Sequence, residues 1–244
     1  MSLVSSLTKR NRKKRNQGPS EMMLIEKVAR FVACEMIRGD YIEFGVFQGH
    51  SFVNAYRSLH QAFQSRVADS GSGNSSSDQA KERQQIIDSM RFFAFDSFEG
   101  LPELSGVDQD TKDFAKGQYS FDEESFCLKV QEEGVDSSKM ITVPGWFDQT
   151  CTESTRQKHE LKSASIVWVD GDLYASAVPA LNFITPLLQD GTVIIFDDWF
   201  AFRGHPHRGE QRAFREWLAT LDGYVATEFQ KEGVWRNSFI MNRT

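Results

Sequence analysis

The chain has 244 residues, of which 40% are apolar and 25% are charged, and its formal net charge at pH 7 is -6. This length is sufficient for one α/β domain with a full core, and the composition is that of an ordinary soluble globular protein. The acidic balance argues against a nucleic-acid-binding surface, and no apolar run approaches the roughly 18 residues of a membrane span. The three cysteines lie far apart, which fits reduced thiols better than disulfides or a zinc site. These features predict a cytoplasmic protein.

Residues 1–19 are strongly basic, and KRNRKKR at 9–15 has six Lys or Arg in seven positions. We predict a solvated, flexible arm and keep open a contact with a membrane surface, a polyanion or a second subunit. An arm that reaches over a neighbouring active site would make the protein a homo-oligomer. Residues 20–244 are predicted to form one domain.

The first half of that domain alternates helical and strand patterns. Helical apolar spacing follows Ser20 and is expected to end at Gly39, and a strand at 41–44 leads through a glycine turn into a helix at 51–63. Residues 66–80 are rich in Ser, Gly and Asp without an apolar period, which predicts a flexible surface insertion. A strand at 91–96 comes next, and then a polar stretch that is expected to cover one end of the sheet.

The second half continues in the same style. A helix over 122–134 is expected to start from Ser120, with Glu123 completing a capping box. The remaining predicted elements are strands at 140–145, 165–170 and 192–197, helices at 174–189 and 209–221, and a hairpin over 224–241. Five strands alternating with helices require parallel pairing. We therefore predict an α/β fold, a Rossmann-like, doubly wound, mostly parallel seven-stranded sheet with a C-terminal antiparallel hairpin.

In such a sheet ligands bind outside the carboxyl ends of the strands, and acidic residues stand at four of those ends. The motif EFGVFQG, from Glu43 to Gly49, joins the first strand to a helix. Gly45 and Gly49 depart from GxGxxG spacing, which disfavours a pyrophosphate cradle and leaves a ligand with an amino acid part and a nucleoside. A purely structural glycine turn stays open. Asp96, after the second strand, suits the two hydroxyls of a ribose or a helix N-cap.

Four further aspartates follow two consecutive strands, in VDGDLY and FDDW. Neighbouring parallel strands lie about 4.8 Å apart, so carboxylates at their ends can share one hard cation, for which magnesium is suited. Spacing alone does not separate the roles of Asp170 and Asp172. Either pair taken alone could be only a cap or a turn.

The whole series resembles the class I S-adenosylmethionine-dependent methyltransferases, and among them the macrocin O-methyltransferase (TylF-like) family, which modifies sugar hydroxyls of antibiotics. The resemblance is carried, over about residues 38–200, by DYIEFGVFQGHSF, FFAFDSFEGLP, VPGWFDQT, VWVDGDLYAS and GTVIIFDDW. The departures from the family pattern are the Ser-rich insertion, the basic arm and FAFRGHPHRGEQ after the aspartate pair.

The resemblance implies a role for each matched residue. It implies that S-adenosylmethionine is held by Glu43, Gly45, Gly49, Ser51, Asp96 and Ser97. Mg²⁺ would be bound by Asp170, Asp197 and Asp198, and Asp172 would be the catalytic base. The implied reaction is methyl transfer to a hydroxyl of a vicinal diol on a small-molecule acceptor.

The acceptor itself is not identified by the sequence, because a sugar diol, a catechol-like ring or another vicinal oxygen pair would all fit a metal. Arg203, His205 and His207 lie in the segment after the aspartate pair and are candidates for substrate contact or a lid. Two other functions stay open. One is a magnesium-dependent phosphatase of the haloacid dehalogenase type, although the stretch between Asp172 and Asp197 has no lysine. The other is a non-catalytic cofactor-binding scaffold.

Overall fold

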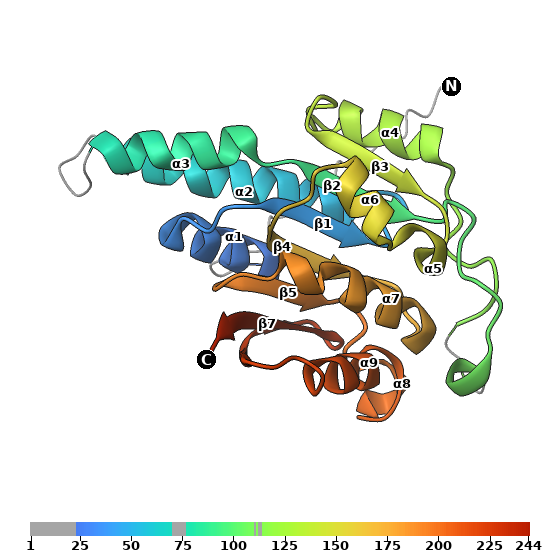
Figure 1. Cartoon of the computed structure of the whole chain (residues 1–244). Helices are drawn as coiled ribbons and strands as arrows, with labels where there is room; N and C mark the ends of the chain where they lie inside the picture. The colour runs from blue at the N-terminus through green and yellow to red at the C-terminus, as the bar shows by residue number, and fades with distance from the viewer. Residues whose placement is uncertain (1–22, 70–76, 110, 112–113) are drawn as a thin grey trace, which may run out of the picture.

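Seven strands form one sheet in the computed structural model, which describes residues 23–69, 77–109, 111 and 114–244 (Figure 1). The strands are β1 (Asp40–Phe44), β2 (Phe92–Asp96), β3 (Met140–Pro144), β4 (Ala164–Val169), β5 (Thr192–Phe196), β6 (Tyr224–Glu232) and β7 (Arg236–Arg243). Their order across the sheet is β3-β2-β1-β4-β5-β7-β6, with β1 to β5 parallel and β7 antiparallel to both of its neighbours. The predicted fold class, including the terminal hairpin, is confirmed.

Helices cover both faces of this sheet. The α-helices are α1 (Leu24–Glu35), α2 (His50–Asp69), α3 (Ser77–Ser89), α4 (Glu123–Glu132), α5 (Phe147–Thr150), α6 (Glu153–Lys158), α7 (Tyr174–Ile184), α8 (Ala201–Gly204) and α9 (Gly209–Leu218). Two short 3₁₀ turns are η2 (Gly106–Asp108) and η3 (Thr185–Leu187). The division into a basic arm and one domain stays a prediction, since the arm lies outside the described residues.

The sheet separates two apolar cores because successive strand side chains point to opposite faces. Tyr41 of β1 packs with residues of α1, α2 and α4, whereas Ile42 and Phe44 pack with residues of α7 and α9. All five residues of β1, β2 and β5 are buried. Continuous burial of this kind is what a central parallel strand covered on both faces requires.

The strand order reverses between β1 and β4, which lie side by side at the centre of the sheet. The carboxyl ends of the parallel strands point to the right in Figure 1, where residues 97–109 and 114–119 run past them. The predicted cover over one end of the sheet is therefore present. Its Leu101 and Phe114 pack with Leu173, Ala201 and Phe202 in a small separate core.

Two predicted helix boundaries are wrong. Helix α4 starts one residue after Asp122, whose carboxylate accepts the Ser125 N–H at 2.9 Å, so Ser120 is not the cap. The expected capping box does not form because the Glu123 carboxylate instead accepts the Thr142 hydroxyl of β3. Helix α1 ends at Glu35, and its chain turns at Met36 in the left-handed region (φ 53°), before Gly39.

The Ser- and Gly-rich segment is also shorter than predicted. Helix α2 continues through Asp69 and α3 begins at Ser77, so irregular backbone at 66–69 and 77–80 was a wrong prediction, and residues 70–76 lie outside the described part. Helix α3 was not predicted because its buried apolar residues are Ile86 and Ile87, which are too few to produce a helical period in the sequence.

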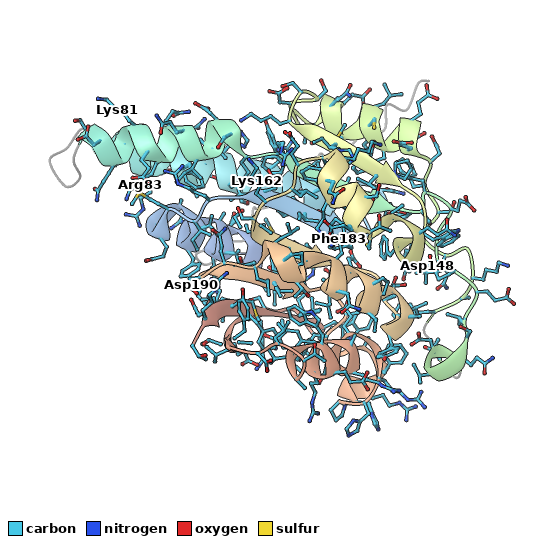
Figure 2. The ribbon with its side chains drawn as sticks, in the orientation of Figure 1. Lys81, Arg83, Asp148, Lys162, Phe183 and Asp190 are labelled. Atoms are coloured by element: carbon cyan, nitrogen blue, oxygen red, sulfur yellow. The ribbon has the colours of Figure 1, made fainter. Side chains whose placement is uncertain are left out.

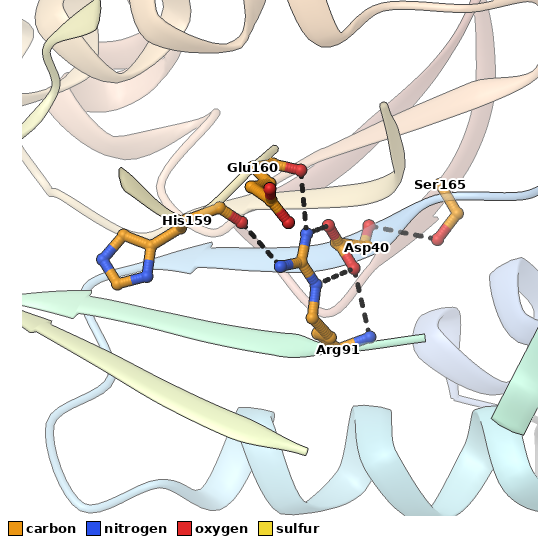
Figure 3. Close-up of polar contacts among 5 residues, drawn as sticks. All are labelled: Asp40, Arg91, His159, Glu160 and Ser165. Atoms are coloured by element: carbon orange, nitrogen blue, oxygen red, sulfur yellow. Dashed lines mark hydrogen bonds and ion pairs between the residues drawn. The ribbon is translucent and has the colours of Figure 1, made fainter. Parts of the chain in front are cut away.

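Hydrogen bonds among a cluster of polar residues connect the amino ends of the central strands (Figure 3). Arg91 donates Nε (3.1 Å) and Nη2 (2.6 Å) to the two carboxylate oxygens of Asp40, and Nη1 donates to the His159 carbonyl at 2.6 Å. The Ser165 hydroxyl donates to the Asp40 carbonyl at 3.2 Å. These bonds join β1, β2 and the start of β4 at the edge opposite the aspartates.

Within the described residues, no helix is both long and apolar enough to span a membrane.

Candidate active site

A cavity of about 650 Å³ opens at the carboxyl ends of β1, β2, β4 and β5. Six aspartates line it: Asp148, and the five that end or follow β2, β4 and β5, which are Asp96, Asp170, Asp172, Asp197 and Asp198. Its other walls come from residues 97–105 and 116–119, the start of α5, the start of α7 and Trp235. Asp148 of this wall projects at the same end of the molecule, whereas Asp190 lies toward the opposite end (Figure 2).

The loop after β1 is packed directly on the loop after β4. Gly45 has φ +89°, and a Cβ there would lie 1.8 Å from the Asp170 carbonyl oxygen. The Asp170 N–H donates to the Phe44 carbonyl at 2.8 Å. A glycine is therefore required at 45 for both its backbone angle and this close approach, and the approach is to protein backbone.

Asp96 organises the glycine loop from the end of β2. Its Oδ2 accepts the N–H groups of Val46 (2.7 Å) and Phe47 (3.2 Å), and its Oδ1 accepts that of Phe98 (2.8 Å). The carboxylate also lines the cavity. Because a carboxylate oxygen can accept two bonds, Oδ1 retains capacity for one more donor. Ser97 lines the cavity beside it and donates its hydroxyl to the Gly100 carbonyl at 2.9 Å.

Three of the predicted cofactor residues do not line the cavity. Glu43 is fully buried, and its carboxyl group accepts the hydroxyls of Tyr41 and Ser51. Burial raises the pKa of Glu43 to about 8. Gly49 (φ +77°) packs against α4, where a Cβ would lie 2.5 Å from Val130 Cγ1. Glu43, Gly49 and Ser51 therefore support the glycine loop without lining the cavity, and their contact with a cofactor stays a prediction.

The carboxylates of Asp170, Asp172 and Asp198 form the densest group of acids in the cavity. One oxygen of each lies within 4.8 Å of the others. Burial raises the pKa of all three, reinforced by the charges of neighbouring carboxylates: Asp172 to about 9, Asp198 to about 6, and Asp170 well above its usual value. Asp172 and Asp198 also share a hydrogen bond, through the proton that Asp172 retains.

Asp197 has a different partner from the other predicted metal ligands. Its Oδ1 accepts Nε of Arg236 at 2.5 Å, and Nη1 of Arg236 donates to Glu232 at 2.9 Å. The guanidinium also lies over the Trp168 ring, 5.5 Å from its centroid. Asp197 thus stands at the rim of the acidic group with an arginine as its counter-ion.

Several residues that shape the site were missed from the sequence. Glu210 of α9 is fully buried, its Oε2 accepts the Asp198 N–H at 3.0 Å, and its Oε1 has no partner in the part of the chain that the structure describes. Asp108 accepts the N–H groups of Tyr174 (3.2 Å) and Ala175 (3.0 Å) at the start of α7. An acidic residue near a helix start was the available signal for Glu210, but it is too common to identify a site.

The predicted substrate residues Arg203, His205 and His207 do not line the cavity. Arg203 belongs to the short helix α8, where both it and Phe202 have left-handed backbone angles (φ 61° and 54°). The backbone N–H of His207 donates to Nδ1 of His205 at 3.2 Å, and the centroids of the two rings lie 5.8 Å apart. Trp146 does line the cavity, whereas Trp199 is packed against Phe196 and Phe239.

Comparisons with known proteins identify the family to which the chain belongs. The family model for macrocin O-methyltransferase (TylF) matches residues 81–223, more than half of the chain. The chain belongs to the macrocin O-methyltransferase family. The predicted resemblance is confirmed, and a haloacid dehalogenase-type phosphatase is excluded with it.

Individual relatives are more distant. The chain is 26% identical over 176 residues to a Streptomyces olivaceus enzyme described as 8-demethyl-8-(2,3-dimethoxy-alpha-L-rhamnosyl)-tetracenomycin-C 4'-O-methyltransferase. That match covers 69% of this chain but 56% of the relative, so the chain spans little more than half of its length.

Solved structures share the fold at low sequence identity. The O-methyltransferase NovP superposes with a TM-score of 0.65 at 18% identity, over 90% of this chain and 78% of that one. The calicheamicin methyltransferase CalS11 gives 0.61 at 19% identity, over 88% and 76%. At such identities the likeness establishes the methyltransferase fold alone.

Proposed function

We propose that this chain is a magnesium- and S-adenosylmethionine-dependent O-methyltransferase that acts on one hydroxyl of a vicinal diol, in a sugar or a related small molecule. The observation that carries the proposal is the convergence of five aspartates from β2, β4 and β5 on one cavity, in a chain of the macrocin O-methyltransferase family. The names of the relatives support a sugar acceptor, since the Streptomyces olivaceus enzyme is named for a rhamnosyl compound.

The residues around Asp96 fit the cofactor. Its carboxylate faces the cavity already fixed by backbone donors and keeps capacity for a ribose hydroxyl, and Gly45 and Ser97 line the same wall. When bound, S-adenosylmethionine supplies a methyl group that its sulfonium makes electrophilic. The task of the chain is then to align an acceptor oxygen with that methyl group and to remove the proton from the oxygen.

The acidic group fits a divalent cation. Buried carboxylates within 4.8 Å of one another, with raised pKa values, are poorly compensated by the protein alone, and carboxylate oxygens are the ligands that magnesium prefers. Asp170 and Asp198 belong both to this group and to the ligand set implied by the family, and we assign them to the metal. Asp197 remains a proposed third ligand that has Arg236 as a competing partner. When bound, magnesium would lower the pKa of an acceptor hydroxyl.

Asp172 is proposed as the base. It lines the cavity at the edge of the acidic group, and it is held with φ +60° directly after Gly171. Without a cation, burial and the neighbouring carboxylates raise the pKa of Asp172 to about 9 and keep it protonated. A divalent cation bound beside it would favour the ionised carboxylate, which is the form that accepts a proton. The proton of the acceptor hydroxyl would pass to a carboxylate oxygen of Asp172 as the oxygen attacks.

Calorimetric titration tests the cofactor and metal assignments separately. We expect wild type to bind S-adenosylmethionine, and Asp96→Asn and Asp96→Ala to bind it at least about tenfold more weakly, because a charge-assisted hydrogen bond contributes about 1.5 to 3 kcal/mol. Asp170→Asn should keep cofactor binding and lose magnesium binding. Asp222→Asn, at an exposed aspartate away from the cavity, is the matched control.

The same preparation is then tested for methyl transfer to methyl α-L-rhamnopyranoside by mass spectrometry. Folded wild-type protein that binds no S-adenosylmethionine would overturn the methyltransferase proposal. Cofactor binding without a magnesium effect or transfer would favour the non-catalytic scaffold.

A further inference from the structure

The tip of the β6–β7 hairpin brings an exposed tryptophan to the cavity. Val234 is 79% exposed and Trp235 is 52% exposed, although burial of an indole ring is strongly favourable. Trp235 lines the cavity, and the other described residues that line it all lie between 45 and 198. The last hairpin of the chain thus contributes one large aromatic side chain to a wall otherwise built by earlier elements.

The strand register places this tryptophan beside the acidic group. In the antiparallel pair of β5 and β7, Phe196 is opposite Asn237, so the next positions set Asp197 opposite Arg236 and Asp198 opposite Trp235. The ion pair between Asp197 and Arg236 fits this continuation. The Phe200 N–H also donates to the Trp235 carbonyl at 3.0 Å, which binds the hairpin tip to the loop that carries the aspartates.

The backbone next to Trp235 is held firmly while its ring stays half exposed. Arg236 bonds to Asp197 and Glu232 and lies over Trp168, and Glu232 in turn accepts the Leu24 N–H at 2.8 Å. A side chain that is positioned by its neighbours yet leaves much of its apolar surface open is suited to contact a ligand.

We propose that Trp235 is the acceptor-positioning residue of this enzyme and takes a ring-shaped acceptor. The apolar C–H face of a pyranose-like ring lies against the indole, which turns two adjacent ring hydroxyls toward Asp170, Asp172 and Asp198. This inference rests on the proposed function and adds to it that the site selects a cyclic over an open-chain diol.

Two acceptors with related hydroxyls separate the ring contact from the diol contact. Methyl α-L-rhamnopyranoside has a ring face, and L-rhamnitol is its open-chain polyol counterpart. For Trp235→Ala we expect the KM for the pyranoside to rise at least about tenfold, with the KM for rhamnitol and the dissociation constant of S-adenosylmethionine changed less than about threefold. Trp235→Phe should recover most of the pyranoside affinity, and Val234→Ala is the control at the adjacent exposed position.

Binding is measured independently of turnover by saturation-transfer NMR of the pyranoside, with S-adenosylhomocysteine and magnesium present. Saturation of the ring C–H protons in wild type that is lost in Trp235→Ala supports the contact. An unchanged ratio of the two KM values in Trp235→Ala, whether both rise or neither does, overturns it even though the enzyme transfers methyl groups. Failure of wild type to bind or methylate either compound, by contrast, rejects the proposed function on such diols together with the inference.

Discussion

At Asp172, charge repulsion and backbone geometry act on the same residue. The carboxyl group shares a hydrogen bond with Asp198, and the backbone has φ +60°, a region that Asp and Asn tolerate better than other side chains except glycine. An asparagine there keeps the shape and the left-handed turn but cannot accept a proton as a carboxylate does. Replacement at this position therefore isolates the chemistry from the fold.

We predict that Asp172→Asn binds S-adenosylmethionine within about threefold of wild type and loses roughly 10²- to 10⁴-fold in kcat, the usual contribution of a positioned general base. Single-turnover methyl transfer measures this effect. Asp148→Asn, at an exposed aspartate that also lines the cavity, should retain most of the activity. Near-normal turnover of Asp172→Asn would remove Asp172 from the role of base.

The positions of the acidic residues were predictable, but their pairing was not. Asp170, Asp172, Asp197 and Asp198 follow apolar runs that could only be neighbouring strands, and parallel pairing brings such strand ends to one edge. The ion pair of Asp197 with Arg236 joins residues 39 apart through the register of β5 with β7. Register depends on the whole hairpin and its turn, and no local pattern of residues encodes it.

Among the elements, residues 97–109 are joined to α7 through a buried helix cap, Asp108. Asp108 is 1% exposed, and its two carboxylate oxygens accept the first N–H groups of that helix. Cavity-lining residues Leu101, Pro102 and Ser105 stand on the same segment. The cap therefore connects the N-terminus of α7 to one wall of the cavity.

We predict that Asp108→Ala costs about 1 kcal/mol of unfolding free energy, as the loss of a helix cap does, and speeds amide hydrogen exchange in residues 97–109. Asp122→Ala removes the cap of α4, away from the cavity, and should lower stability without changing exchange in that segment. Exchange followed by mass spectrometry distinguishes the two variants. Equal protection of residues 97–109 in Asp108→Ala and wild type would contradict the anchoring role.

The sequence predicted helices and strands correctly where their apolar runs were long, but it did not predict a helix of mostly polar composition. The predicted strands were found because each is a continuous buried run between turn residues, as in FFAFD and TVIIF. Helix α3 was missed because most of its surface faces solvent and its buried residues are Arg83, Ile86 and Ile87. So few buried apolar positions leave a weak local signal.

At the scale of the whole molecule, the sheet separates two apolar cores, and buried acidic residues lie at the carboxyl ends of its parallel strands. Glu43, Asp170, Asp172, Asp198 and Glu210 all have pKa values raised, chiefly by burial. At the amino ends of the strands, by contrast, Asp40 forms an ion pair with Arg91. The two ends of the parallel strands thus differ in charge compensation: an ion pair lies at the amino ends, and buried carboxyl groups with raised pKa values lie at the carboxyl ends, where we propose that ligands bind.

This asymmetry predicts how stability depends on pH. A carboxyl group whose pKa is raised by folding keeps its proton in the folded state while the unfolded chain loses it, so the free energy of unfolding falls as the pH rises. For Glu43 the fall begins near its unfolded value of 4.5 and is complete above its folded value of about 8, and its full size is on the order of several kcal/mol. Urea unfolding of wild type without added cofactor or metal, between pH 5 and 8, measures this slope. In Glu43→Gln the amide stays neutral at every pH, so we expect a clearly shallower slope, whereas Glu132→Gln, at an exposed glutamate of α4, should keep the wild-type slope. Parallel profiles for wild type and Glu43→Gln would mean that Glu43 is ionised inside the folded protein, with a countercharge that its hydroxyl partners do not provide.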